Sequence, residues 1–142
     1  LPVNFLEHLS GMDPNMEAVE QLAADHDAEG VYVFTFDAIG RGTAQDTTLH
    51  ARTFVPGLGI DEDPVTGTAS GAAGAYLDQF AAFDGELPEE LRFEQGHFLD
   101  RPGHVEVRVD GDAVRVGGRA VVSTEGELTL PAERDDDDII EA

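Results

Sequence analysis

The positions of the apolar residues first predict a helix near the start of the chain. Residues 14–25 carry apolar side chains at helical spacing, beginning with Met16. Asp13 is suited to cap this helix and Pro14 to occupy its first turn, while Gly30 closes the segment. We therefore expect a helix over residues 14–25.

Two strands are predicted to follow this helix. Residues 31–36 form a dense run of β-branched and aromatic side chains, a pattern typical of a strand buried on both faces. We expect this strand to lie in the middle of its sheet. Residues 48–55 alternate polar and apolar side chains and stop at the turn signal Pro56-Gly57, which indicates a second strand.

The composition changes in residues 66–80, where alanine dominates and glycine recurs at Gly67, Gly71 and Gly74. Glycine inside a helix costs about 0.5–1 kcal/mol relative to alanine. Placing Gly71 and Gly74 in a helix therefore implies a neighbour that packs closely against the backbone. We expect a buried helix from about residue 68 to residue 80.

The final third of the chain has the pattern of short strands. Val105 and Val107 alternate with charged side chains, and Asp110-Gly111 is a hairpin turn signal. This pattern predicts an antiparallel meander with one solvated face. The expected strands are residues 91–94, 104–109, 113–116, 120–123 and 127–130.

Composition narrows the class of protein. The chain has 142 residues, with 8 basic and 30 acidic side chains and a formal net charge of −22. Such a charge repels nucleic acids and anionic lipid headgroups, so we expect neither as a partner. The length suits one domain, assigned to residues 1–134 and followed by an acidic tail at residues 135–142. The chain has no cysteine and no apolar run that could span a bilayer, so we expect a cytoplasmic protein.

The acidic excess has two interpretations. At about 1 M salt the Debye length falls to about 3 Å, which removes most of the repulsion among surface carboxylates, so the composition favours a protein from a halophile. The alternative is a non-catalytic acidic module that binds calcium or another protein. Its ligands would come from residues 61–63 or from Asp135 to Asp138, although neither segment follows the calcium-loop pattern.

Polar residues are concentrated between the second predicted strand and the small-residue helix. The first turn of a helix leaves amide donors unpaired, so the amides of Gly67, Thr68 and Ala69 are suited to hold a carboxylate or enolate oxygen. Asp63 lies just before them and is a candidate acid that donates or shares a proton with the bound anion.

A simpler interpretation of the same residues stays open. Asp63-Pro64 forms only a turn in this interpretation, and Thr66 or Thr68 is only a helix cap. The histidines do not point to a metal site, because the separations of His50, His97 and His104 match no zinc motif and no cysteine accompanies them.

Several segments resemble signatures of the PhzF family, the phenazine biosynthesis-like isomerases. The Glu-Asp-Pro-Val-Thr-Gly-Thr-Ala segment at residues 62–69 is the most specific of them, and the resemblance covers nearly the whole chain. The other matching segments are Arg-Thr-Phe-Val-Pro at 52–56, Gly-Ile at 59–60, Glu-Gln-Gly at 94–96, Arg-Pro-Gly at 101–103 and Val-Gly-Gly-Arg-Ala at 116–120.

The resemblance implies an α+β fold like that of diaminopimelate epimerase. That fold has two similar halves, each a strongly curved mixed sheet wrapped around one central helix, with the active site between them. This chain resembles the second half only, and its small-residue helix would be the central helix. The resemblance carries Asp63 and Thr68 onto catalytic positions, and Gly67 with its neighbours Thr66 and Ala69 onto substrate-binding positions.

By the same resemblance, Gln95 and His97 lie near the cleft, where we expect them to form a structural turn. Thr68 stands where the family has serine, which keeps the hydroxyl and adds a methyl group that bears on substrate fit. Neither Gln95 nor His97 is predicted to be catalytic.

The activity that the resemblance implies is an isomerase that moves a proton on a small carboxylate-bearing substrate, with no cofactor. The family's catalytic glutamate and a substrate-contacting histidine belong to the first half, near a Gly-Asn-Pro motif that this chain lacks. The isolated chain is therefore expected to be inactive and to need the missing N-terminal half as its partner.

Three further expectations follow. Leu1 stands where an initiator methionine would be, which favours a fragment over a short separate subunit. The amino-acid epimerases of this superfold use paired cysteines, and a chain with no cysteine excludes that chemistry. A second half alone exposes its cleft face, so a homodimer formed through that face is also expected.

Overall fold

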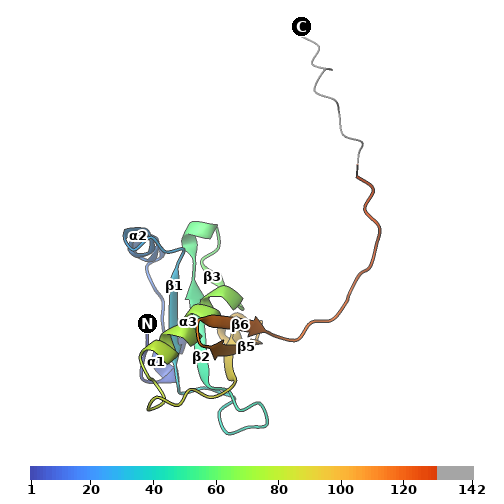
Figure 1. Cartoon of the computed structure of the whole chain (residues 1–142). Coiled ribbons are helices and arrows are strands. Elements are labelled where there is room, and N and C mark those ends of the chain that lie inside the picture. Colours follow the sequence, from blue (N-terminus) through green and yellow to red (C-terminus); the bar gives the residue numbers. More distant parts are fainter. Residues whose placement is uncertain (131–142) are drawn as a thin grey trace.

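A single six-stranded sheet organises the chain in the computed structural model, which describes residues 1–130 (Figure 1). The predicted acidic tail at residues 135–142 lies outside the described residues. The elements in chain order are α1 (Leu6–Ser10), α2 (Met16–Asp25), β1 (Val31–Thr35), β2 (Leu49–Phe54), the 3₁₀ turn η1 (Pro56–Leu58), β3 (Glu62–Asp63), α3 (Gly67–Gln79), β4 (Leu91–Gln95), the 3₁₀ turn η2 (His97–Leu99), β5 (Gly103–Asp110) and β6 (Ala113–Gly117).

The sheet has the strand order β1-β2-β4-β5-β6, and the short β3 pairs with β2. Among the strands of residues 1–130, only β2 and β4 pair in parallel, and α3 lies in the connection between them. The remaining pairs are antiparallel, and β4, β5 and β6 form the predicted meander. Gly111 has a φ of 58° at the turn between β5 and β6, which confirms the hairpin expected at Asp110-Gly111. The predicted α+β fold class is therefore confirmed, with a sheet that is mostly antiparallel.

The small-residue helix packs closely against the sheet, as its glycines predict. A Cβ atom on Gly74 would lie 2.5 Å from Val107 Cγ1, and one on Gly71 would lie 3.0 Å from Val116 Cγ2. Val107 belongs to β5 and Val116 to β6. The absence of a side chain at both glycines therefore lets the helix backbone approach these strands, and the larger Leu77 of the same helix is buried.

Each face of the sheet has its own apolar core. The core on the α3 side, here called the inner face, includes Leu49, Phe93 and Leu77. The core on the opposite, outer face joins Phe54 and Leu9, with partly buried residues of α2 packed against it. Successive residues of a strand point to opposite faces, so β2 and β4 supply side chains to both.

Strand β1 is buried on both faces but lies at an edge of the sheet, so the prediction of a central strand is wrong. Val33 packs into the outer core and Phe34 into the inner core. The dense apolar pattern of β1 arises because helices cover both faces of the sheet at this strand. Such cover does not require that β1 have a neighbouring strand on each side. The free side of β1 is partly covered by the first residues of the chain, since the Val3 amide donates to the Phe34 carbonyl at 2.8 Å.

The predicted helix over residues 14–25 is confirmed, although its start differs from the expectation. Asn15, and not Asp13, is the N-cap, and its side chain accepts a hydrogen bond from the Ala18 amide at 3.2 Å. Pro14 therefore precedes the helix, and the helix ends at Asp25, before Gly30.

The strands predicted at residues 120–123 and 127–130 are not formed. Residues 118–130 have no regular structure, and in Figure 1 this segment runs away from the sheet. Val121 is 91% exposed and Leu128 is 85% exposed. A strand needs a hydrogen-bonding neighbour, and within the described residues these two segments pair with no strand.

Candidate active site

A pocket lies on the inner face, where the start of α3 meets the sheet. Its volume is about 510 Å³, and it is lined by four of the predicted site residues, Asp63, Thr66, Thr68 and Ala69. Apolar side chains, including Ile60, complete part of the wall. The structure thus brings the predicted acid and the first turn of the helix to one cavity.

Gly67 is the predicted site residue that does not line this pocket. A Cβ atom there would lie 3.5 Å from Val116 Cγ1 of β6, so this side of the helix turns toward the sheet edge and away from the cavity. Gly67 can therefore contribute only its backbone amide to the site.

Sheet register explains the floor of the pocket. Tyr32 of β1 pairs with Thr53 of β2, and Thr53 pairs with Asp63 of β3. Residues directly opposite one another in antiparallel strands share a face and have neighbouring side chains. Tyr32, Thr53 and Asp63 therefore form a row across three strands, and all three line the pocket.

Two side chains of this row differ in their hydrogen bonding. The hydroxyl of Thr53 is buried and has no hydrogen-bond partner within residues 1–130. The hydroxyl of Tyr32 lies 3.4 Å from Ser70 Oγ, and Ser70 donates to the Thr66 carbonyl at 2.7 Å. Burial raises the pKa of Tyr32 to about 12, an effect that the Ser70 hydrogen bond opposes, so Tyr32 stays a neutral donor at neutral pH.

The Asp63 carboxylate is held by its own turn. The Thr66 hydroxyl donates to Asp63 Oδ2 at 2.5 Å. Gln95, at the end of β4, donates from Nε2 to the Asp63 carbonyl at 2.6 Å and to Thr66 Oγ1 at 3.2 Å. Its Oε1 accepts from the Thr66 amide at 3.3 Å. These contacts tie the turn before α3 to the neighbouring strand.

The helix start is left without a side-chain cap. Thr66 occupies the N-cap position, but its hydroxyl makes no capping hydrogen bond. Within the described residues, the amides of Gly67, Thr68 and Ala69 have no acceptor, and the first bonded amide is that of Ser70. The interpretation of Thr66 as an ordinary cap is therefore wrong, and the donors predicted to face an anion are unpaired.

Gly96 allows β4 to end close to this turn. Its φ is 83°, and a Cβ atom on it would lie 2.6 Å from the Pro64 carbonyl oxygen. The Glu-Gln-Gly segment at residues 94–96 thus has a glycine where a side chain would press on the turn that holds Asp63.

The outer face carries a second buried polar cluster. Glu94 accepts hydrogen bonds from the Gly40 amide at 3.0 Å and from the Ile39 amide at 2.5 Å, and it lies 2.8 Å from His50 Nδ1. Burial favours the neutral acid, but the hydrogen bonds from His50 and the two amides outweigh it, so the pKa of Glu94 is lowered. The Arg52 guanidinium donates to Glu62 at 2.7 and 2.9 Å.

Three of the five histidines, His50, His97 and His104, lie on this outer face, away from the pocket. The rings of His50 and His97 are 5.0 Å apart, and each has one buried nitrogen without a partner in the described part of the chain, as does His104. Burial lowers the pKa of His97, and the neighbouring His50 and His104 lower it further. No group of three or more histidine, cysteine or acidic residues within residues 1–130 is arranged to hold a metal ion.

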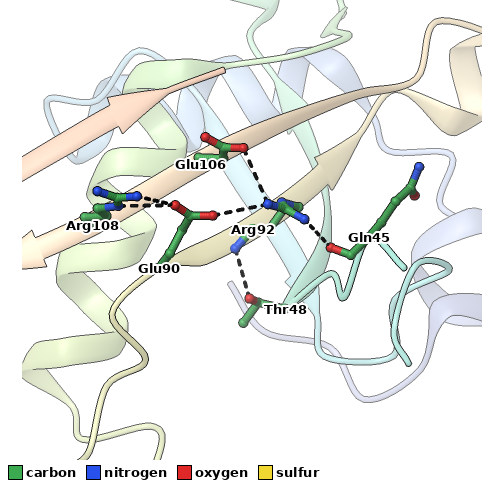
Figure 2. A network of polar contacts seen from close by, with 6 residues as sticks. All are labelled: Gln45, Thr48, Glu90, Arg92, Glu106 and Arg108. Carbon is green, nitrogen blue, oxygen red and sulfur yellow. Dashed lines mark hydrogen bonds and ion pairs between the residues drawn. The ribbon is translucent and has the colours of Figure 1, made fainter. Parts of the chain in front are cut away.

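A third polar network lies near the surface of the meander (Figure 2). Glu90 joins Arg108 at 2.7 Å to Arg92 at 3.2 Å, and Arg92 also donates to the Gln45 carbonyl at 2.5 Å. The hydrogen bond from Arg108 is the main cause that lowers the pKa of Glu90. These arginines are engaged by carboxylates and a carbonyl of the chain itself, so the network holds the segment around Gln45 against β4.

Sequence reasoning missed two residues that line the pocket and one, Gln95, that supports it. Gln95 was assigned only a turn, yet its buried side chain bonds to the Asp63 and Thr66 segment; the Glu-Gln-Gly motif was the signal that pointed to it. Thr53 and Tyr32 carried no signal of their own, because their place in the pocket depends on the pairing of β1, β2 and β3.

The fold and the pocket together define an α+β protein with polar groups gathered at the start of α3, a helix that is buried on one side only, where a fully buried one was predicted. The family model of the phenazine biosynthesis-like proteins, PhzC-PhzF, matches residues 1–126. The chain belongs to this family. No helix among the described residues has both the length and the apolar character needed to cross a membrane.

Relatives and solved structures agree with the family. The chain is 36% identical over 135 residues to an uncharacterized isomerase of Clostridium acetobutylicum, covering 90% of this chain and 43% of the relative. It is 36% identical over 138 residues to an uncharacterized isomerase of Deinococcus radiodurans, covering 89% and 41%. The crystal structure of a PhzF-family phenazine biosynthesis protein from Bacillus anthracis matches with a TM-score of 0.63 and 28% identity over 81% of this chain and 39% of that one. The chain thus spans about two fifths of the length of these proteins.

Proposed function

We propose that this chain is the second half of a PhzF-like isomerase that transfers a proton on a small carboxylate-bearing substrate without a cofactor. The observation that carries the proposal is the pocket in which Asp63 lies beside the uncapped start of α3. The isomerase names of the relatives support the reaction class. The comparisons give no support to the alternative of a non-catalytic acidic module.

The chemistry proposed for this half is to hold an anion and to supply a proton. The amides of Gly67, Thr68 and Ala69 are free donors at the positive end of the helix dipole and would hold a carboxylate or enolate oxygen. Thr68 adds an exposed hydroxyl at the same end of the helix. Asp63 Oδ2 is already bonded to Thr66, so Oδ1 is the oxygen that would exchange a proton with the substrate.

The base belongs to the half that this chain does not contain. Proton removal next to a carboxylate requires a positioned base within hydrogen-bond reach as well as stabilisation of the developing charge. Within this proposal, the sheet curves around α3 as one half of a diaminopimelate epimerase-like fold, and the cleft between the halves holds the substrate. A cytoplasmic location is a further part of the proposal, as is a homodimer formed through the cleft face when the second half is alone.

The test is proton exchange by the two halves together. The chain is combined with its first half, and cyclic or unsaturated amino-carboxylates are incubated with it in D₂O, so that NMR follows deuterium entering next to the carboxylate. Asp63→Asn is expected to slow the exchange by at least about tenfold, as loss of a positioned proton donor does. The matched control is the exposed Asp61→Asn, for which the rate should not change. Equal rates for Asp63→Asn and the wild type would remove Asp63 from the mechanism.

A further inference from the structure

Gln95 is buried although it carries a polar amide, and only 1% of its surface is exposed. It lies at the end of β4 and makes three hydrogen bonds to the turn before α3. A buried amide that is fully engaged with one short turn fixes the geometry of that turn.

The partners of Gln95 determine which way its amide points. The Asp63 carbonyl can only accept and the Thr66 amide can only donate, so Nε2 must face the former and Oε1 the latter. The second hydrogen of Nε2 then points at Thr66 Oγ1, which must accept it. The proton of the Thr66 hydroxyl is left to bond Asp63 Oδ2, as observed.

This chain of donors keeps Thr66 from capping the helix. A threonine at the N-cap normally accepts a hydrogen bond from the second or third amide of the helix, here Thr68 or Ala69. Thr66 instead donates to Asp63 and accepts from Gln95, and both amides are unpaired in the described residues.

We propose that Gln95 is a positioning residue that holds the Thr66 hydroxyl on Asp63 and so keeps the first amides of α3 open to a carboxylate ligand. This inference rests on the proposed function, because it assumes that the open amides bind the substrate carboxylate. Gln95 does not touch the ligand and acts through Thr66.

The experiment uses the 142-residue chain and 2-aminobenzoate, a simple cyclic unsaturated amino-carboxylate. Amide NMR shifts of Gly67, Thr68 and Ala69 are followed during titration. Gln95→Met keeps the length of the side chain and removes its hydrogen bonds, so Thr66 is free to cap the helix. We expect the affinity for 2-aminobenzoate to fall at least fivefold, and the exposed Gln79→Met to leave it unchanged.

A second substitution separates positioning from general support of the fold. Thr66→Val removes the hydroxyl that would occupy the amides, so adding it to Gln95→Met should restore most of the lost affinity. If the double variant binds as weakly as Gln95→Met, or if Gln95→Met binds as well as the wild type, the role of Gln95 is overturned while the proposed function stands.

A further substitution covers the case in which the Gln95→Met variant does not fold. If Gln95→Met does not fold, Gln95→Glu replaces it; its carboxylate cannot donate, so binding should be weak at neutral pH and approach that of the wild type as acid restores a donor. If the ratio of the wild-type affinity to the variant affinity does not change with pH, the positioning role of Gln95 is contradicted.

If 2-aminobenzoate shifts none of the three amides in the wild type, with or without the first half, the proposed function itself fails and the inference fails with it.

Discussion

Glu94 and Gln95 are consecutive residues of β4, and their side chains work on opposite faces of the sheet. Glu94 gathers His50 and the amides of Ile39 and Gly40 on the outer face. Gln95 holds Thr66 and the Asp63 turn on the inner face. Both side chains are 1% exposed, so burial alone does not distinguish their roles.

The difference lies in what each cluster leaves unpaired. On the outer face each charged group has a partner, since Glu94 has His50 and two amides and Arg52 has Glu62, and the atoms left unpaired in the described residues are histidine ring nitrogens. On the inner face the hydrogen bonds are arranged so that backbone donors and the Thr53 hydroxyl have no partner in the chain described. Paired charges stabilise the fold, whereas unpaired donors at a pocket are suited to bind a ligand.

The largest effect on stability is expected from opening the outer cluster at Arg52. Arg52→Met leaves Glu62 a buried charge without its partner, which costs about 3–5 kcal/mol of unfolding free energy. Urea unfolding measures the loss. Adding Glu62→Gln should recover part of it, because the buried charge is then removed; a loss below about 1 kcal/mol would show that Arg52 contributes little more than a surface pair does.

A smaller loss, with a defined pH dependence, is expected at Glu94. Glu94→Gln weakens hydrogen bonds to a charged group, so it should cost about 1.5–3 kcal/mol at pH 7. The pKa of Glu94 is lowered in the folded state, so its contribution is present above the ordinary glutamate pKa and is lost as the pH falls below it. Urea unfolding at several pH values should show the two proteins converging in acid. A constant difference would contradict this assignment.

The smallest effect is expected on the inner face, at Tyr32. Tyr32→Phe removes only the hydrogen bond to Ser70 and should cost about 0.5–1.5 kcal/mol at neutral pH. The pKa of Tyr32 is raised to about 12 by burial, so the wild type should lose stability as the pH rises from about 10 to about 12, where the unfolded chain ionises first. The variant should lose less, because one buried tyrosine no longer contributes. The free energy of unfolding of the wild type and of the variant is measured at pH 9 and at pH 11. If both lose the same amount between these pH values, Tyr32 is in contact with solvent.

The sequence predicted which helices and strands form better than it predicted which strands pair with one another. Alternation at Val105 and Val107 predicted β5, and the glycines of α3 predicted its close packing, because both patterns record a local contact. The edge position of β1 was missed because apolar residues record burial and not strand pairing. Val121 and Val122 have the residue types of a strand, but a strand also needs a partner, which sequence periodicity does not report.

The candidate site was likewise predictable only where its residues are close in sequence. Asp63 and the amides at the start of α3 follow one another in sequence, so a motif could point to them. The state of Thr66 could not be predicted, because a threonine at a helix start is ordinarily a cap and only the approach of Gln95 changes its partner. Contacts of this kind are set by tertiary structure and have no local signature.

The parallel pairing of β2 and β4 also bears on how the protein folds. The hairpin of β5 and β6 closes between near neighbours, whereas Ala51 meets Gln95 only after the chain has passed through α3. Pairings across such a separation form slowly, because closing the intervening loop costs entropy before any contact compensates for it. A chain arrested before this step has its hairpin but lacks the hydrogen bonds from Gln95 to the turn before α3. Binding of a carboxylate at the start of α3 would therefore report on a late stage of folding.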